Sequence, residues 1–446
     1  MSERKYWDEG LETLSRSELE ALQLKSLKDE LAHAYANSPY YKRAWDEAGI
    51  HPDDVKTLAD LIRFPFIDKK TQRDAQGVGS FLGELAAVPE EDVIFISTSS
   101  GSTGVPTLSP FTAQDFDEFQ ETEARLFWQA GIRPKDRYVH ALNFALYVGG
   151  PDVIGAQRTG ALCIWVGAVP SERLLFVLKT YQPTVIWTSP SYIIALGEKA
   201  LQSGINPKTD LSVRKIIVAG EMGGSIGATR QAITDIWGAE LYDFYGLSDI
   251  FGACAAQCEV HDGLHIAEDH IYVETVDLNT GELLPPGERG ELVFTTLRKK
   301  ARPIIRFRTG DIGRIDITPC KCGRTHGRIY VDGRKDDMFI VSAVNVYPSD
   351  IEYVIRALPE ISNEYTIRIF EENYTCKYEV NVENVSDKSE TEIRELVVNT
   401  LKARVGVKPA IVNVHANGTL ERSTHKAKRV IDQRAETVAK SQGEGI

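Results

Sequence analysis

Residues 93–110 combine hydroxyl and glycine residues in a pattern that could hold an anion. A β-rich run at 93–96 leads into the sequence STSSGSTG, and Pro106 follows shortly afterwards. Gly101 and Gly104 allow backbone geometries that turn successive N–H groups inward, and the hydroxyls add further donors. This is not a P-loop, because no lysine follows the second glycine. The pattern indicates either a polyphosphate-binding loop or an ordinary solvated loop.

Three further short motifs place polar residues next to predicted strands. The sequences AGE at 219–221 and YGLSD at 245–249 each follow a β-rich run, and RTGD at 308–311 ends a later one. Ligands gather at the carboxyl ends of the strands in parallel sheets. We therefore expect 219–221 and 245–249 to lie near the hydroxyl and glycine residues.

Clustered cysteines and histidines suggest a metal site. A CxC turn lies at 320–322, and the upstream candidates are Cys254, Cys258, His261 and His265. Two thiolates from one turn, with a cysteine and an imidazole from another segment, would make a closed tetrahedral site of the structural zinc type. The alternative is that the buried thiols merely pack.

The elements around these residues predict an α/β fold. Residues 7–36 show helical spacing of leucines, and a capping box at Thr112 and Asp115 predicts a helix that ends near Gly131. Between residues 137 and 244, β-rich runs alternate with amphipathic segments, which indicates parallel sheet with flanking helices.

From residue 271 onward, the sequence pattern changes to short β-runs separated by turns. Turn sequences at 279–281 and 286–287 separate short β-runs, so we expect a β-subdomain over about 271–332. The remaining chain shows β-runs and two helical segments near 349–358 and 390–404, enough for a small α+β domain. We predict a large N-terminal domain over 1–332 and a small mobile C-terminal domain over 333–446.

Composition limits the classes of function. The chain has 446 residues, 42% of them apolar and 26% charged, and a net charge of −13, which argues against a general nucleic-acid surface. The start lacks the apolar core of a signal peptide, and no apolar stretch approaches the length of a membrane span. We expect a cytoplasmic protein that binds neither nucleic acid nor membrane.

Five motifs occur in the order found in adenylate-forming enzymes, the acyl-CoA synthetase superfamily. They are the hydroxyl–glycine stretch, YGLSD, RTGD, GRKDDMFIVSAVNVYPSDIE at 333–352 and ERSTHKAKR at 421–429. The chain resembles the phenylacetate–CoA ligase branch more closely, through YYKRAWDEAGI at 40–50, PSYIIA at 190–195, EDH at 268–270, RPIIRFRTGD at 302–311 and NVYPSDIE at 345–352.

The resemblance implies a two-step reaction. A carboxylic acid attacks the α-phosphate of ATP to give an acyl-adenylate and pyrophosphate, and the thiol of coenzyme A then displaces AMP. Both steps move negative charge on oxygen, so they need donors and cations around the phosphates more than a nucleophilic side chain. The implied small molecules are an aryl or arylacetic acid, ATP, Mg²⁺ and CoA.

The resemblance also implies a set of nucleotide-binding residues. The β- and γ-phosphates would be held by Ser99, Ser100, Gly101, Ser102, Thr103 and Gly104. The adenine would lie against Ala219, Gly220, Glu221, Asp243, Phe244, Tyr245 and Gly246, with the Tyr245 ring over its face. Asp311 would accept hydrogen bonds from the ribose, and Arg308 and Arg334 are phosphate or ribose candidates.

Lys426 and Asp336 are the implied catalytic residues. The Lys426 ammonium would bridge the α-phosphate and the substrate carboxylate, and Asp336 would be the hinge about which the small domain rotates. His425 precedes this lysine where the family has glycine, and Lys428 is a nearby alternative. Asp249 would bind Mg²⁺, although the family normally has glutamate there. The hydroxyl–glycine stretch has Val105 where a lysine is common.

By the same resemblance, a structural Zn²⁺ would be bound by Cys258, His265, Cys320 and Cys322, with His261 as the alternative histidine. The acid would lie beside Asn143, Phe144, Tyr147, Ser189, Pro190 and Gly246. Two other functions compete with CoA ligation: delivery of the acyl group to a carrier protein or another acceptor, and a non-catalytic nucleotide-binding role. A homodimer is a further expectation.

Overall fold

The computed structural model describes residues 4–99, 106–144, 149–221, 223–335, 339–341, 344–346, 348–372, 375–422 and 429–433. The chain forms two compact units. Unit 1 comprises Met1–Thr188, Leu211–Gly220 and Tyr242–Val331, and unit 2 comprises Ser189–Asp210, Glu221–Leu241 and Asp332–Ile446. The predicted boundary at residue 332 stays a prediction.

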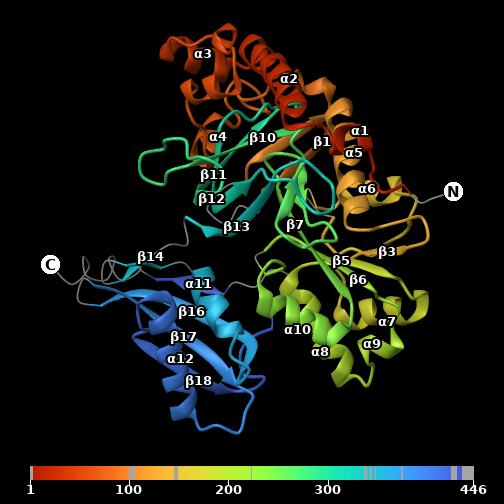
Figure 1. Ribbon diagram of the computed structural model, residues 1–446, viewed down its shortest axis with the longest axis vertical. Helices are drawn as coiled ribbons and strands as arrows, with labels where there is room; N and C mark the ends of the chain where they lie inside the picture. Colours follow the sequence, from red (N-terminus) through yellow and green to blue (C-terminus); the bar gives the residue numbers. More distant parts are fainter. Residues whose placement is uncertain are drawn as a thin grey trace. The chain divides into compact units, whose positions relative to one another are not determined.

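An eleven-stranded sheet forms the centre of unit 1 (Figure 1). Its order is β10-β11-β12-β13-β9-β8-β7-β6-β5-β3-β4. The strands are β3 (Arg137–His140), β4 (Leu162–Trp165), β5 (Val185–Thr188), β6 (Lys215–Val218), β7 (Glu240–Leu247), β8 (Gly252–Ala256), β9 (Leu264–Ile266), β10 (Ile271–Val276), β11 (Gly290–Thr296), β12 (Phe307–Asp316) and β13 (Arg328–Arg334).

The sheet has a parallel and an antiparallel part. Strands β4, β3, β5 and β6 pair in parallel, in registers such as Val139 with Ile186 and Ile186 with Ile216. The pairs β7–β8, β8–β9, β9–β13, β10–β11 and β11–β12 are antiparallel. The predicted α/β class is confirmed, and the predicted β-subdomain belongs to the same sheet as the parallel strands.

Two long helices of unit 1 begin with capping boxes. Ser15 and Glu18 form a capping box at the start of α2, and Thr112 and Asp115 form the predicted one at α5. The helical elements are α1 (Glu9–Glu12), α2 (Arg16–Asn37), α3 (Pro39–Ala48), η1 (Pro52–Asp54), η2 (Leu58–Arg63), α4 (Lys69–Ala75), η3 (Glu90–Asp92), α5 (Ala113–Gln129), α6 (Asp152–Arg158) and α7 (Ser171–Tyr181).

Unit 2 contains a four-stranded sheet in the order β18-β17-β16-β19. The central pair β16 (Ile361–Glu372) and β17 (Thr375–Asn384) is antiparallel, and β18 (Ile411–Ala416) and β19 (Val430–Asp432) pair with them in parallel. The other elements are α8 (Pro190–Gln202), α9 (Pro207–Asp210), α10 (Gly227–Trp237), β14 (Phe339–Val341), β15 (Val344–Val346), α11 (Pro348–Arg356) and α12 (Glu390–Val405). The two predicted C-terminal helices correspond to α11 and α12.

Each unit has its own apolar core. In unit 1, Phe127, Trp187 and Phe244 pack ring against ring between α5 and the sheet, with centroids 4.9 to 5.5 Å apart. In unit 2, Ile367 of β16 and Val380 of β17 belong to one buried cluster that also contains residues of α11 and α12. Among the described residues, none of the helices has the length and apolar character that a bilayer crossing requires.

Candidate active site

The hydroxyl–glycine loop joins the two strands of a hairpin. Strands β1 (Val93–Thr98) and β2 (Leu108–Thr112) pair antiparallel and form a separate two-stranded sheet. The strand before the loop therefore does not belong to the eleven-stranded sheet. Ser99 and Thr107 close the hairpin: Thr107 N donates to Ser99 Oγ at 3.0 Å, and Ser99 N donates to Thr107 O at 3.1 Å.

The remaining residues of the predicted phosphate-binding loop are Ser100, Gly101, Ser102, Thr103 and Gly104, and they lie outside the described residues. The two residues at the ends of the loop also bond through their side chains, since Thr107 Oγ1 lies 3.0 Å from Ser99 Oγ. The structure therefore fixes both ends of this loop.

Tyr245 and Asp311 meet although 66 residues separate them. The Tyr245 hydroxyl donates to Asp311 Oδ2 at 2.5 Å, and its ring packs edge-on against Phe294 at 5.9 Å. Gly246 follows on β7, where an added Cβ would lie only 2.0 Å from Gly252 O. Only glycine fits there, since the backbone of β8 approaches so closely. The structure brings together the residues predicted to cover the adenine and bind the ribose.

Of the other predicted adenine residues, three follow β6 directly, and Asp243 and Phe244 lie within β7. Ala219 N donates to Thr188 O at 3.2 Å, and Gly220 follows with a φ of 88°, which favours glycine. Phe244 is buried in the core. Asp243 N donates to Gln257 Oε1 at 3.1 Å. In unit 2, Glu221 accepts hydrogen bonds from the backbone N and hydroxyl of Ser191.

We expect Asp311→Asn to raise the KM for ATP by about 10- to 100-fold. A charged carboxylate gains about 1.5–3 kcal/mol from its hydrogen bonds, and the amide would lose most of that toward the ribose hydroxyls. Steady-state kinetics with varied ATP measures this effect. Tyr245→Phe is the matched control, because it removes the hydroxyl partner and keeps the carboxylate. Equal KM values in Asp311→Asn and wild type would exclude the ribose contact.

The two candidate arginines, Arg308 and Arg334, lie on different strands of the large sheet. Arg308 Nε donates to Glu291 Oε2 at 3.0 Å, and its guanidinium lies 5.3 Å from the Phe66 ring centroid. Arg334 ends β13. Their phosphate or ribose contacts stay predictions. Asp336 and Lys426 lie outside the described residues, so their catalytic roles also stay predictions.

Asp249 lies in the turn between β7 and β8 and is 2% exposed. Its Oδ2 accepts a hydrogen bond from Lys69 Nζ, and its Oδ1 lies 3.2 Å from Thr107 Oγ1 and 3.8 Å from Arg302 Nη2. Lys299 Nζ donates to the carbonyls of Asp249 and Ile250 at 3.0 and 2.5 Å.

These cations determine the charge state of Asp249. Burial would raise the pKa of its carboxyl, but Lys69 and Arg302, followed by Lys299, together hold the pKa below its ordinary value. None of the three cations belongs to the YGLSD motif, so that motif could not identify them. Asp249 therefore stays ionised near neutral pH with both oxygens engaged.

The predicted acid-binding residues fall in both units. In unit 1, Asn143 and Phe144 follow β3, and the Phe144 ring lies 5.0 Å from the His140 ring and stacks on Trp165 at 5.5 Å. Tyr147 lies outside the described residues. In unit 2, Ser189 caps α8 by accepting from Tyr192 N, and Pro190 is its first residue. Whether these residues contact the acid stays a prediction.

The predicted metal ligands form a compact buried cluster. One ligand atom from each of Cys258, His265, Cys320 and Cys322 lies within 4.8 Å of the others. Cys258 Sγ is 3.9 Å from Cys320 Sγ, and Cys322 Sγ is 3.4 Å from His265 Nε2. Zn–S bonds of about 2.3 Å in a tetrahedron place two sulfurs about 3.8 Å apart, so the cluster fits zinc.

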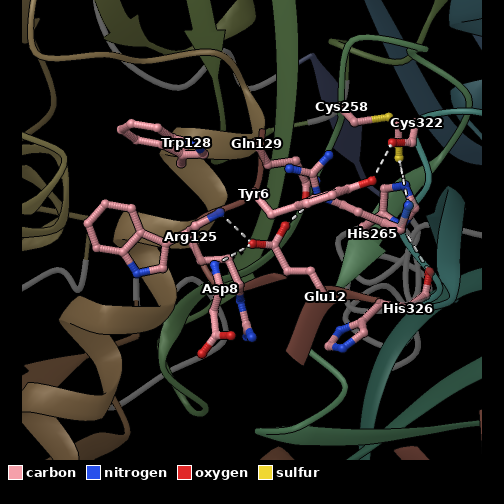
Figure 2. A network of polar contacts seen from close by, with 12 residues as sticks. Tyr6, Asp8, Glu12, Arg125, Trp128, Gln129, Cys258, His265, Cys322 and His326 are labelled. Atoms are coloured by element: carbon pink, nitrogen blue, oxygen red, sulfur yellow. Dashed lines mark hydrogen bonds and ion pairs between the residues drawn. The ribbon is translucent and has the colours of Figure 1, made fainter. Parts of the chain in front are cut away.

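Neighbouring groups orient the His265 ring and lower the pKa of Cys322, and both effects favour cation binding. His265 Nδ1 lies 2.8 Å from His326 O, which leaves Nε2 facing the thiols (Figure 2). The pKa of Cys322 is lowered, first by its hydrogen bond with Cys258 and then by His265, and a thiolate is the form that binds metal. His261, the alternative ligand, is not in the group, and its ring packs against Tyr242 at 4.8 Å.

The N-terminal segment packs on the loop that carries Cys320 and Cys322. Tyr6 OH donates to Cys322 O at 3.3 Å (Figure 2). Arg324 Nε donates to Glu12 Oε2 at 2.6 Å in a buried ion pair. His326 Nε2 lies 3.1 Å from Leu11 O, and Thr325 N donates to Glu12 O at 3.1 Å. The cluster therefore joins the sheet to the start of the chain.

Comparison with known families agrees with this arrangement. The family described as "AMP-binding enzyme" matches residues 30–296, and "AMP-binding enzyme C-terminal domain" matches residues 343–434. The fold and site thus define an adenylate-forming enzyme.

The relatives narrow this class. The phenylacetate–coenzyme A ligase of Aromatoleum evansii is 37% identical over 96% of this chain and 97% of that protein, and the one of Pseudomonas putida is 36% identical over 95% and 96%. The chain belongs to the phenylacetate–CoA ligase family, and it is an ATP-dependent, AMP-forming acid–CoA ligase.

A solved structure shows the same fold at full length. The 2-hydroxyisobutyryl-CoA ligase in the postadenylation state, in complex with 2-HIB-AMP, has a TM-score of 0.92 and 29% identity, over 99% of this chain and 95% of that one. Another structure of that ligase, in complex with 2-HIB-AMP and CoA in the thioesterification state, has a TM-score of 0.73.

Proposed function

We propose that this enzyme activates an arylacetic acid, with phenylacetate as the first candidate. The observation that carries the proposal is the 36–37% identity to phenylacetate–coenzyme A ligases over nearly the whole chain. The aromatic residues beside the predicted acid pocket support it, since Phe144 stacks on Trp165 and contacts the His140 ring. A flat aromatic acid gains favourable contacts from such rings.

In this mechanism the acid's carboxylate oxygen attacks the α-phosphorus and pyrophosphate leaves. Ser99 and the loop it anchors hold the β- and γ-phosphates through backbone N–H groups and hydroxyls. Tyr245 covers the adenine, Asp311 binds the ribose, and Lys426 neutralises the two anions that must approach each other. The CoA thiolate then attacks the acyl carbon and AMP leaves, after rotation of the small domain about Asp336.

Two metal ions have different places in this proposal. Mg²⁺ accompanies ATP, as is general for this family, and enters bound to the polyphosphate. Zn²⁺ would be held by Cys258, His265, Cys320 and Cys322, where it would supply a structural cross-link and no chemistry. We also propose a cytoplasmic location, where ATP and CoA are available, and a homodimer, which light scattering can test.

The proposal is tested by a panel of acids in which AMP release is measured with and without CoA. We expect phenylacetate and ring-substituted arylacetates to give the highest kcat/KM, with AMP release that depends on CoA over many turnovers. The panel includes 2-hydroxyisobutyrate, because a ligase for that acid shares the fold over the whole chain. A preference of tenfold or more for small aliphatic hydroxy acids would contradict the arylacetate assignment.

A further inference from the structure

The environment of Asp249 does not resemble that of a magnesium ligand. Mg²⁺ requires near-octahedral oxygen ligands at 2.0–2.1 Å and usually keeps several waters. Asp249 is 2% exposed, which leaves little room for those waters. Lys69 Nζ donates to one of its oxygens, and Thr107 Oγ1 lies 3.2 Å from the other. The residues present therefore do not fit a resident Mg²⁺ at this carboxylate.

Protein cations surround this aspartate instead. Lys69 contacts the carboxylate directly, and Arg302 Nη2 lies 3.8 Å from it in a pair whose side chains are both 3% exposed. Lys299, fully buried, fixes the turn through the carbonyls of Asp249 and Ile250. Lys299 also lies near Asp115 and Glu30, so the two cations that face the Asp249 carboxylate itself are Lys69 and Arg302. Two cations beside one carboxylate suit a polyanion.

The same network reaches the hydroxyl–glycine loop. Lys69 Nζ also donates to Thr107 Oγ1 at 3.2 Å, and Thr107 in turn bonds Ser99 across the ends of the loop. Lys69 is the first residue of α4, and its side chain is 34% exposed, so it is the cation of this group that solvent reaches. Asp249 thus holds Lys69 beside Thr107, at one end of the loop.

We propose that Asp249 is a positioning residue that holds Lys69 and Arg302 as built-in counter-charges for the triphosphate, and that it is not a ligand of the divalent cation. The proposal rests on the proposed function only in taking the triphosphate to bind beside Ser99 and Thr107. An aspartate in place of the family's glutamate agrees with it, because the shorter side chain keeps the carboxylate close to Lys69. The metal then enters and leaves on the phosphate oxygens alone.

Binding measurements without any acid test this directly. Electron paramagnetic resonance of Mn²⁺ gives the affinity of the ion for the enzyme saturated with the ATP analogue AMP-PNP, in wild type and in Asp249→Asn. We expect a change of less than threefold, because the substituted carboxylate is not a ligand. A tenfold or greater loss of Mn²⁺ affinity would overturn the proposal.

A second variant keeps the test decisive if Asp249→Asn does not fold. Calorimetric titration with AMP-PNP in EDTA measures nucleotide binding without metal, and Lys69→Met should weaken it at least tenfold. Lys70→Met is the matched control, since Lys70 is the next residue on α4, its side chain is 75% exposed, and it pairs with Asp74. Equal affinities in Lys69→Met and Lys70→Met would refute the role of Lys69. Neither measurement depends on which acid is the substrate.

Discussion

Replacing Lys426 by alanine should lower the rate of acyl-adenylate formation by about 10²- to 10³-fold, the usual cost of removing one transition-state charge donor. The ammonium would bridge the α-phosphate and the attacking carboxylate, two anions that otherwise repel. Thioester formation from preformed acyl-adenylate should change little, because the lysine has no charge to bridge in that step. ATP–pyrophosphate exchange measures the first half-reaction, and CoA-dependent AMP release from synthetic acyl-adenylate measures the second.

Lys428 provides the control for this prediction. It lies two residues further along the same basic segment, so Lys428→Ala removes the same charge from the same part of the chain. If Lys428→Ala slowed adenylation more than Lys426→Ala, the catalytic lysine would be reassigned. Equal losses of both half-reactions in Lys426→Ala would instead indicate a general structural defect.

The second large effect concerns the cysteine–histidine cluster. Cys322→Ser should remove one zinc per chain and destabilise unit 1 by about 4 kcal/mol, the contribution of a ligand present at a thousand times its dissociation constant. The loss should spread to the N-terminal segment, because Tyr6 and Glu12 bond to the loop that the metal would close. Elemental analysis measures the zinc content, and thermal melting measures the loss of stability. Hydrogen exchange over residues 4–37 measures the effect on the N-terminal segment.

Cys376→Ser serves as the control, because Cys376 is partly buried in the other unit and outside the cluster. It should keep its zinc and its melting temperature. Two results together would exclude the metal site. The wild-type protein would contain no zinc after purification with the metal present, and its melting temperature would equal that of Cys322→Ser.

Local patterns predicted the fold class and much of the candidate site. The leucine spacing indicated α2, the capping box placed the start of α5, and the CxC turn identified two cluster residues. The cluster forms because β9 pairs with β13, which brings His265 opposite Arg328, close to the CxC loop. Spacing alone could not choose between His261 and His265. His261 sits in a turn with a φ of 56° and packs on Tyr242.

Contacts between residues far apart in the chain could not be predicted from local sequence patterns. Asp249 belongs to a recognisable motif, but its partner Lys69 is 180 residues away, and nothing in the residues around Lys69 marks it as a site residue. The pairing of β1 was also missed. Pro110 in β2 argues against a strand, yet a two-stranded hairpin tolerates proline because its outer backbone groups need no partner.

The most direct test of the account is a single-turnover experiment with enzyme in excess over phenylacetate, quenched at short times and analysed by mass spectrometry. Without CoA, the account predicts that phenylacetyl-adenylate and pyrophosphate accumulate to about one equivalent of the acid. Addition of CoA should convert the adenylate into equal amounts of phenylacetyl-CoA and AMP. Formation of ADP and phosphate, or of the thioester without a preceding adenylate, would contradict it.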